Sequence, residues 1–233
     1  MPDQLATDTI DQELIPGARN AIRDCLRLKP EERITIITDE ATQDIAAALQ
    51  GEVEELGAEY ATFVLEHYAP RPLTGMPEVI LEDLATSQVS IFCAQTQRGE
   101  LGSRIEMTTV VNRHRLRHGH MVNISRQIMR EGMRADFLAV DELSQRLVER
   151  ARRTRKVTCR TPMGTDYVAE LSPELKWLKT SGIITQEKWG NLPGGEIFTS
   201  PFNSNGIFVV DGVVGDYLCQ KYGDIQATPL TIE

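Results

Sequence analysis

The sequence has no apolar run near the roughly 20 residues that a membrane-spanning helix needs, so we expect no membrane partner. The N-terminus is acidic and lacks the basic and apolar parts of a signal peptide, which predicts a cytoplasmic protein. Positive charge is also scarce, because 25 Lys and Arg face 34 Asp and Glu, for a net charge of −9. Nucleic acid is therefore not expected as a partner, since a polyphosphate binder needs a positive field.

The sequence has too few cysteines for a disulfide framework. The four cysteines form no Cys-x-x-Cys pair, which argues against a disulfide scaffold and a thiolate zinc site. Cys93 follows Ser-Ile-Phe in an apolar run, so we interpret it as a small core residue of a buried strand. A catalytic thiol would need a nearby base, and the sequence identifies none.

Short β-branched runs alternate with helical patterns along the first part of the chain. We predict strands at 33–38, 60–65, 89–94 and 120–124, and helices at 11–27, 42–56, 78–86 and 104–118, with a further helix that ends near 152. Asp39 and Glu40, which precede the helix at 42–56, are predicted to cap it. Strands that are apolar throughout and alternate with helices are typical of a parallel sheet covered on both faces. The predicted fold class is therefore α/β, with an open, mostly parallel sheet that has helices on both faces.

The character of the chain changes after the basic run 150–156. We interpret this run as a helix C-terminus and linker rather than an anion-binding patch, because cations complement the helix dipole there. A hairpin is predicted next, then strands at 206–214 and 225–232. The predicted domains are thus 1–153 and a β-rich 154–233. A final strand at a sheet edge leaves backbone groups unpaired, so we expect either a fragment of a longer protein or a covering partner.

One stretch combines a fixed turn with an acid. In Asn191-Leu-Pro-Gly-Gly-Glu-Ile-Phe-Thr-Ser-Pro201, a proline and two glycines precede Glu196, which opens a β-prone segment. Proline fixes its own φ and glycine tolerates φ values closed to other residues, so the chain should turn sharply and aim the carboxylate. A carboxylate held in this way suits a hard or borderline cation. The plainer interpretation is a hairpin turn with an exposed glutamate.

The same stretch resembles the Asn-(Leu/Met)-Pro-x-Gly-Glu-(Val/Ile)-Phe-Thr-x-Pro segment of the thermophilic-type metallo-aminopeptidases, the M29 or aminopeptidase T family. Weaker similarity covers Cys25-Leu-Arg-Leu-Lys-Pro-Glu-Glu-Arg-Ile-Thr-Ile-Ile-Thr-Asp39, which looks like that family's first helix and strand. Thr161-Pro-Met-Gly-Thr-Asp166 looks like the segment ahead of its metal loop. Only the motif around Glu196 is specific.

The resemblance implies a metal-dependent hydrolase that removes N-terminal residues from peptides. Glu196 would be a ligand of one or two divalent ions, with zinc, cobalt, manganese and iron all open. The ions would lower the pKa of a bound water and polarise the scissile carbonyl. The other metal ligands of that family are a second Glu, two His, a Tyr and an Asp. In family members they lie in a later part of the chain, which this sequence does not include. We therefore expect this sequence to be an incomplete portion, assign no catalytic residue, and expect a peptide or small-molecule substrate and a homodimer.

Two alternatives to a peptidase remain open. Ring-cleaving dihydroxypyridine dioxygenases, with one non-haem iron, look like distant relatives on the same scaffold. An inactive fragment that acts through interaction is the other, although the preserved acid in the motif weighs against it.

Two further groups of residues are candidate sites. His114 and His118 have the i, i+4 spacing of a helical zinc site, with His120 beyond them, but interleaved arginines favour a solvated basic helix end. The loop 95–103 follows a predicted strand, and Arg98 in it could meet an anion. Its glycine spacing matches neither a dinucleotide fingerprint nor a P-loop.

Overall fold

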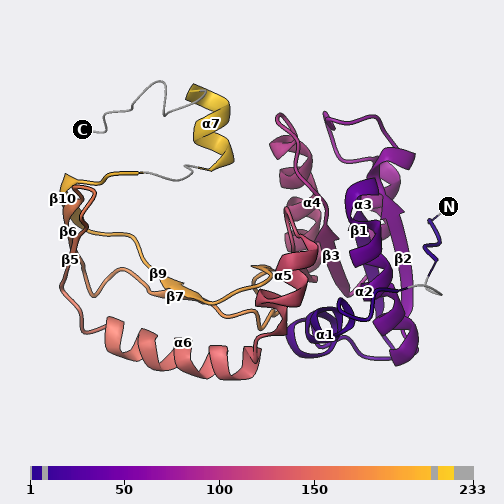
Figure 1. Cartoon of the computed structure of the whole chain (residues 1–233), viewed down its shortest axis with the longest axis horizontal. Coiled ribbons are helices and arrows are strands. Elements are labelled where there is room, and N and C mark those ends of the chain that lie inside the picture. The colour runs from indigo at the N-terminus through magenta and orange to yellow at the C-terminus, as the bar shows by residue number, and fades with distance from the viewer. Residues whose placement is uncertain (1, 7–9, 211–214, 223–233) are drawn as a thin grey trace. The chain divides into compact units, whose positions relative to one another are not determined.

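The structure is a computed structural model that describes residues 2–6, 10–210 and 215–222 (Figure 1). Contacts divide the chain into two compact units. The first is Met1–Glu142 with Thr180–Gly195, and the second is Leu143–Lys179 with Glu196–Glu233. The segment 180–195 thus belongs with the N-terminal unit, although it lies within the stretch predicted as the second domain. The predicted boundary at residues 153 and 154 stays a prediction.

The first unit is built on a five-stranded sheet of order β2-β1-β3-β4-β8, in which each neighbouring pair is parallel. The strands are β1 (Arg33–Thr38), β2 (Glu59–Val64), β3 (Val89–Cys93), β4 (Arg117–His120) and β8 (Gly190–Asn191). Residues of β1 and β3 are almost all fully buried, which explains their continuous apolar sequences. The predicted parallel α/β fold is confirmed.

Helices cover both faces of this sheet. They are α1 (Ile15–Arg19), a π-helix (Asn20–Cys25), α2 (Gln43–Leu56), α3 (Glu78–Leu84), α4 (Leu101–His114), α5 (Arg126–Arg130) and the first part of α6 (Phe137–Ala151). Short 3₁₀ turns occupy Glu40–Thr42, Leu65–His67 and Gly132–Arg134. Alternate β1 residues face opposite cores: Ile34 and Ile36 pack with α1 and α2, whereas Ile37 packs with α3 and α4.

Three predicted elements of the first unit differ from those observed. The strand predicted at 120–124 lies earlier, at Arg117–His120. The opening helix changes from α to π at Asn20, so it is not one regular helix over 11–27. The helix predicted to reach residue 118 ends at His114, because Arg115 takes a left-handed conformation with φ of 55°. The N–H of Arg115 bonds the Asn112 and Val111 carbonyls, and the chain then pairs with β3 as a strand.

The second unit contains small sheets. The predicted hairpin is confirmed, because β5 (Lys156–Arg160) pairs antiparallel with β6 (Asp166–Glu170), which in turn pairs antiparallel with β10 (Asn203–Ile207). A separate two-stranded sheet joins β7 (Leu178–Thr180) and β9 (Glu196–Phe198), and α7 spans Asp216–Tyr222. The strand predicted at 206–214 is thus centred earlier, and its last four residues, like 225–232, lie outside the described residues.

Two glycines let the segment 180–195 pack against the first unit. A Cβ on Gly194 would lie 2.7 Å from the Gly182 backbone nitrogen, so the two backbones approach too closely for any larger residue. Gly182 has φ of 88°, and a Cβ there would lie 2.4 Å from Cδ1 of Phe137. Beside it, the Ser181 hydroxyl donates a hydrogen bond to the Asp141 carboxylate. These contacts fix the path of the chain toward Glu196.

We predict that Gly182→Ala lowers the free energy of unfolding by about 2–4 kcal/mol, because it combines left-handed strain with overlap against Phe137. Gly57→Ala is the matched control. Gly57 has a similar φ of 79°, but no atom lies within 4 Å of its added Cβ. It should cost only the conformational part, about 1–2 kcal/mol. Urea denaturation measures both, and equal losses would show that the Phe137 contact is unimportant.

Candidate functional site

Glu196 is exposed at the start of β9, directly after a constrained bend. On the way into this bend, Asn191 pairs with His120, and the Leu192 N–H bonds the His120 carbonyl at 3.0 Å. The Leu192–Pro193 peptide is cis. Neither Gly194 nor Gly195 has a positive φ, so glycine is needed at 194 for close approach rather than for an unusual backbone conformation.

The described residues do not bring a metal site together around this carboxylate. Among them, no group of three or more His, Cys, Asp and Glu side chains is placed to hold an ion. A catalytic zinc site uses three protein ligands, and Glu196 supplies one. The assignment of Glu196 as a metal ligand therefore stays a prediction, and no catalytic step through a metal follows from this structure.

The histidines lie differently from the predicted basic helix end. His114 is exposed at the end of α4, but His118 and His120 are buried on one face of β4. The His118 Nδ1 lies 2.8 Å from the Ser90 hydroxyl, and its Nε2 lies 3.2 Å from Nδ1 of His120. His120 also stacks on Phe92 at a centroid distance of 5.3 Å. The prediction of a solvated helix end is wrong for these two residues, because the strand begins before them.

Burial keeps both imidazoles neutral. It lowers the pKa of His120 to about 4, and the nearby positive charge of Arg104 acts in the same direction. The pKa of His118 falls well below its ordinary value, first through burial and then through repulsion by His120. A neutral, hydrogen-bonded pair of this kind belongs to the core of the sheet.

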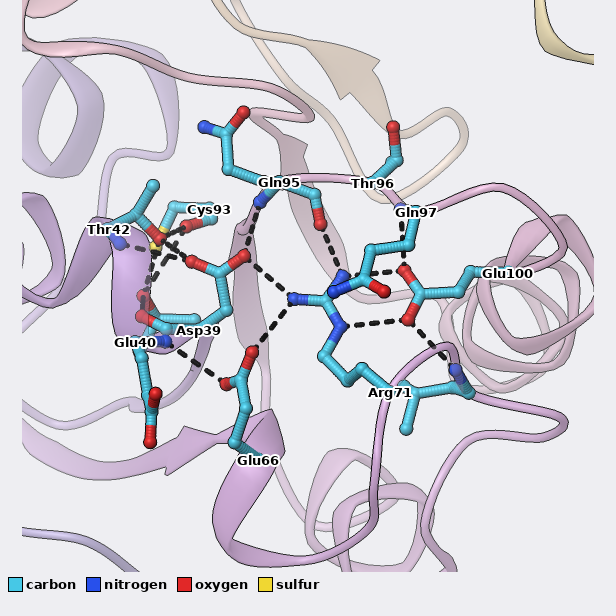
Figure 2. Close-up of polar contacts among 12 residues, drawn as sticks. Asp39, Glu40, Thr42, Glu66, Arg71, Cys93, Gln95, Thr96, Gln97 and Glu100 are labelled. Carbon is cyan, nitrogen blue, oxygen red and sulfur yellow. Dashed lines mark hydrogen bonds and ion pairs between the residues drawn. The ribbon is translucent and has the colours of Figure 1, made fainter.

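The strand order places the usual ligand crevice of an open α/β sheet between β1 and β3, whose chains leave the sheet in opposite directions. Here a cluster of the protein's own charged side chains occupies that place (Figure 2). Asp39 follows β1, Glu66 follows β2, and Glu100 lies in the loop after β3. All three carboxylates bind Arg71, whose side chain is only 4% exposed.

Every N–H of the Arg71 guanidinium has an acceptor. Its Nε and one Nη2 N–H bind the two oxygens of Glu100, at 2.8 and 2.5 Å. Its Nη1 binds Asp39 at 2.8 Å and Glu66 at 3.2 Å, and the other Nη2 N–H binds the Gln95 carbonyl. Five donors therefore meet five acceptors, which is the full capacity of an arginine.

The two buried carboxylates, those of Asp39 and Glu100, also have hydrogen-bond donors on both oxygens. Asp39 accepts from the Thr42 N–H and hydroxyl through Oδ1, and from Arg71 and the Gln95 N–H through Oδ2. Glu100 accepts from the N–H groups of Leu73 and Gln97 besides Arg71. Burial alone would raise the pKa of Glu100, but these partners hold it below its ordinary value. The predicted helix-capping role of Asp39 is confirmed.

This ion cluster argues against an anion site in the loop 95–103. The N–H groups of Gln95 and Gln97, which could have held a phosphate, bind the internal carboxylates of Asp39 and Glu100 instead. Arg98 is exposed and lies outside the cluster. Sequence reasoning missed Arg71 because it lies in a proline-rich loop, and no local pattern marks a loop arginine as buried.

The fold and these sites define a class: an open parallel α/β unit followed by small β-sheets, with Glu196 at the entrance to the second unit. No protein-family model matches the chain, and no curated protein matches it significantly in sequence. A solved structure, wild-type AmpT from Thermus thermophilus, is similar with a TM-score of 0.59 and 15% identity. The match covers 84% of this chain.

The chain spans 63% of the AmpT chain. The resemblance to aminopeptidase T is therefore confirmed for the fold, over the part that the two chains share. At 15% identity the similarity establishes the fold alone. Within the residues that the structure describes, no helix is long and apolar enough to cross a membrane.

We predict that Arg71→Met lowers the free energy of unfolding by about 3–5 kcal/mol at pH 7, because it leaves buried carboxylates without their cation. Arg126→Ala is the control, since Arg126 pairs with Asp44 at the surface and is 54% exposed. It should cost about 1 kcal/mol or less. Chemical denaturation monitored by circular dichroism compares them, and similar losses would contradict the structural role of Arg71.

We predict that the buried histidines make the fold sensitive to mild acid. Their folded pKa values lie below the unfolded value of about 6.5, so their contribution is complete above pH 6.5 and declines as the pH falls toward 4. The protonation of His120 should lower the free energy of unfolding by about 2 kcal/mol between pH 7.5 and 5, and His118 acts in the same direction. His120→Phe should flatten this pH dependence, and the surface variant His114→Gln should not. An unchanged profile in His120→Phe would contradict the prediction.

Proposed function

We propose that this chain forms part of a metal-dependent hydrolase of the aminopeptidase type, acting on peptides. The observation that carries the proposal is the similarity of its fold to AmpT over 84% of the chain, at low sequence identity. The motif around Glu196 adds support from the sequence, because that motif resembles a metal-binding segment of the aminopeptidase T family. Peptide as substrate and pairing of two copies belong to the same proposal, as does a location in the cytoplasm.

Glu196 is the residue to which the proposal assigns a metal contact. The bend that precedes it is held by the pairing of Asn191 with β4 and by the close approach of Gly194 to Gly182, while the Glu196 side chain is exposed. An exposed carboxylate can offer oxygen to a cation. The remaining ligands of such a site would have to come from residues other than those described, because three are needed.

The proposal predicts weak metal binding and little or no aminopeptidase activity for this 233-residue chain by itself. Isothermal titration of the metal-free protein with zinc or manganese measures the first, and hydrolysis of a chromogenic leucine anilide measures the second. Glu196→Gln should reduce the remaining affinity by roughly tenfold or more, since loss even of a residue that supports a ligand costs that much.

Glu174→Gln is the matched control, because Glu174 is an exposed glutamate of the same unit and lies outside the motif. It should bind metal as the wild type does. Tight stoichiometric binding that survives Glu196→Gln would show that the ligand assignment is wrong.

A further inference from the structure

A pocket of about 460 Å³ lies within the second unit, apart from the bend that carries Glu196. It forms where the chain leaves α6 and where it passes from β6 to β7. Its volume is in the range of small-ligand sites, which run from roughly 300 to 1,000 Å³. The lining residues are Arg152, Ser172, Pro173, Leu175, Lys176 and Trp177.

Local hydrogen bonds shape this pocket. The Glu174 N–H donates to the Ser172 hydroxyl at 3.2 Å, and the Leu175 N–H donates to the Ser172 carbonyl at the same distance, which forms a tight turn. The Arg152 N–H bonds the Val148 carbonyl and continues the last turn of α6. None of these hydrogen bonds uses a charged side chain.

The charge of the lining is one-sided. Arg152 and Lys176 contribute cations, and no acidic residue is among the lining residues. Neither cation forms an ion pair with any residue that the structure describes. Arg152 also belongs to the basic run 150–156, in a chain whose net charge is −9. A local positive potential on an acidic protein attracts anions selectively.

The rest of the lining is apolar. Pro173, Leu175 and Trp177 supply hydrophobic surface next to the two cations. Trp177 is partly buried, so part of its side chain is exposed. An indole offers a large contact area, and arginine binds a carboxylate through two parallel hydrogen bonds. A ligand that contacts both the two cations and the apolar lining carries a carboxylate beside an apolar group.

We propose that this pocket binds a short acidic peptide, with a carboxylate between Arg152 and Lys176 and a neighbouring apolar side chain against Trp177. The carboxylate can be that of a side chain or that of the peptide C-terminus. Both sources present the same chemical group, a carboxylate.

The pocket is connected to the strand that carries the candidate metal ligand. The Thr199 hydroxyl donates a hydrogen bond to the Lys176 carbonyl at 3.0 Å, and Thr199 directly follows β9, which begins at Glu196. β7 follows Trp177 and forms a two-stranded sheet with β9. A bound peptide would therefore be anchored on the same small sheet as Glu196. Its role as a substrate anchor rests on the proposed peptidase function, whereas peptide binding itself does not.

Calorimetric titration of the full chain tests the proposal with acetyl-Leu-Glu-Leu-Glu, whose blocked N-terminus prevents removal of residues. We expect saturable binding that quenches or shifts tryptophan fluorescence, with the optical change lost in Trp177→Phe. Arg152→Ala and Lys176→Ala should each weaken binding by roughly tenfold, as expected for loss of a charge-assisted contact. Arg113→Ala, which removes an exposed cation from α4, should bind as the wild type does.

Further arms make the outcome decisive. The C-terminally amidated peptide and its glutamine analogue separate the two carboxylate sources, because loss of affinity in either identifies the group that binds. If the amidated glutamine analogue, which has no carboxylate at all, binds as tightly as the parent peptide, the proposal is wrong. It is also overturned if inorganic phosphate binds as tightly as the peptide, or if Arg113→Ala weakens binding as much as Arg152→Ala. Glu196→Gln should still bind the peptide, so failure of the metal assignment and failure of the pocket are distinguishable.

Discussion

The guanidinium of Arg71 joins the carboxyl ends of the central strands of the first unit. It binds the carboxylates that follow β1 and β2 and the carboxylate of Glu100 in the loop after β3. It also donates a hydrogen bond to the Gln95 carbonyl (Figure 2). A buried cation with three carboxylates is stable only if each charge has partners, because desolvation of an unpaired ion costs several kcal/mol. Here backbone N–H groups and Thr42 complete the coordination of the acids.

This cluster changes what the sheet can do. Open α/β folds usually bind ligands at the crevice where strand order reverses, and in this chain an internal ion network occupies that place. The chemistry that the sequence suggests therefore lies elsewhere, at the bend that ends in Glu196 and in the second unit. The first unit serves this bend as a support, since β8 and the segment 180–195 are packed against it.

Several large apolar side chains of the second unit are exposed. Phe202, Ile207 and Phe208 are each at least 64% exposed. The same unit contains the pocket to which we assign peptide binding, and the lining of that pocket includes two cations and an indole.

The sequence alone determined the parallel α/β unit, the β5–β6 hairpin and the cap at Asp39, because these depend on short-range periodicity and turn chemistry. It also marked Glu196, through a motif that is continuous along the chain. Only the tertiary structure decided that His118 and His120 are a buried neutral pair, that Arg71 closes the crevice, and that 180–195 returns to the first unit. Each of these depends on residues far apart in sequence, and the desolvation and close packing that govern them exist only once the chain has folded.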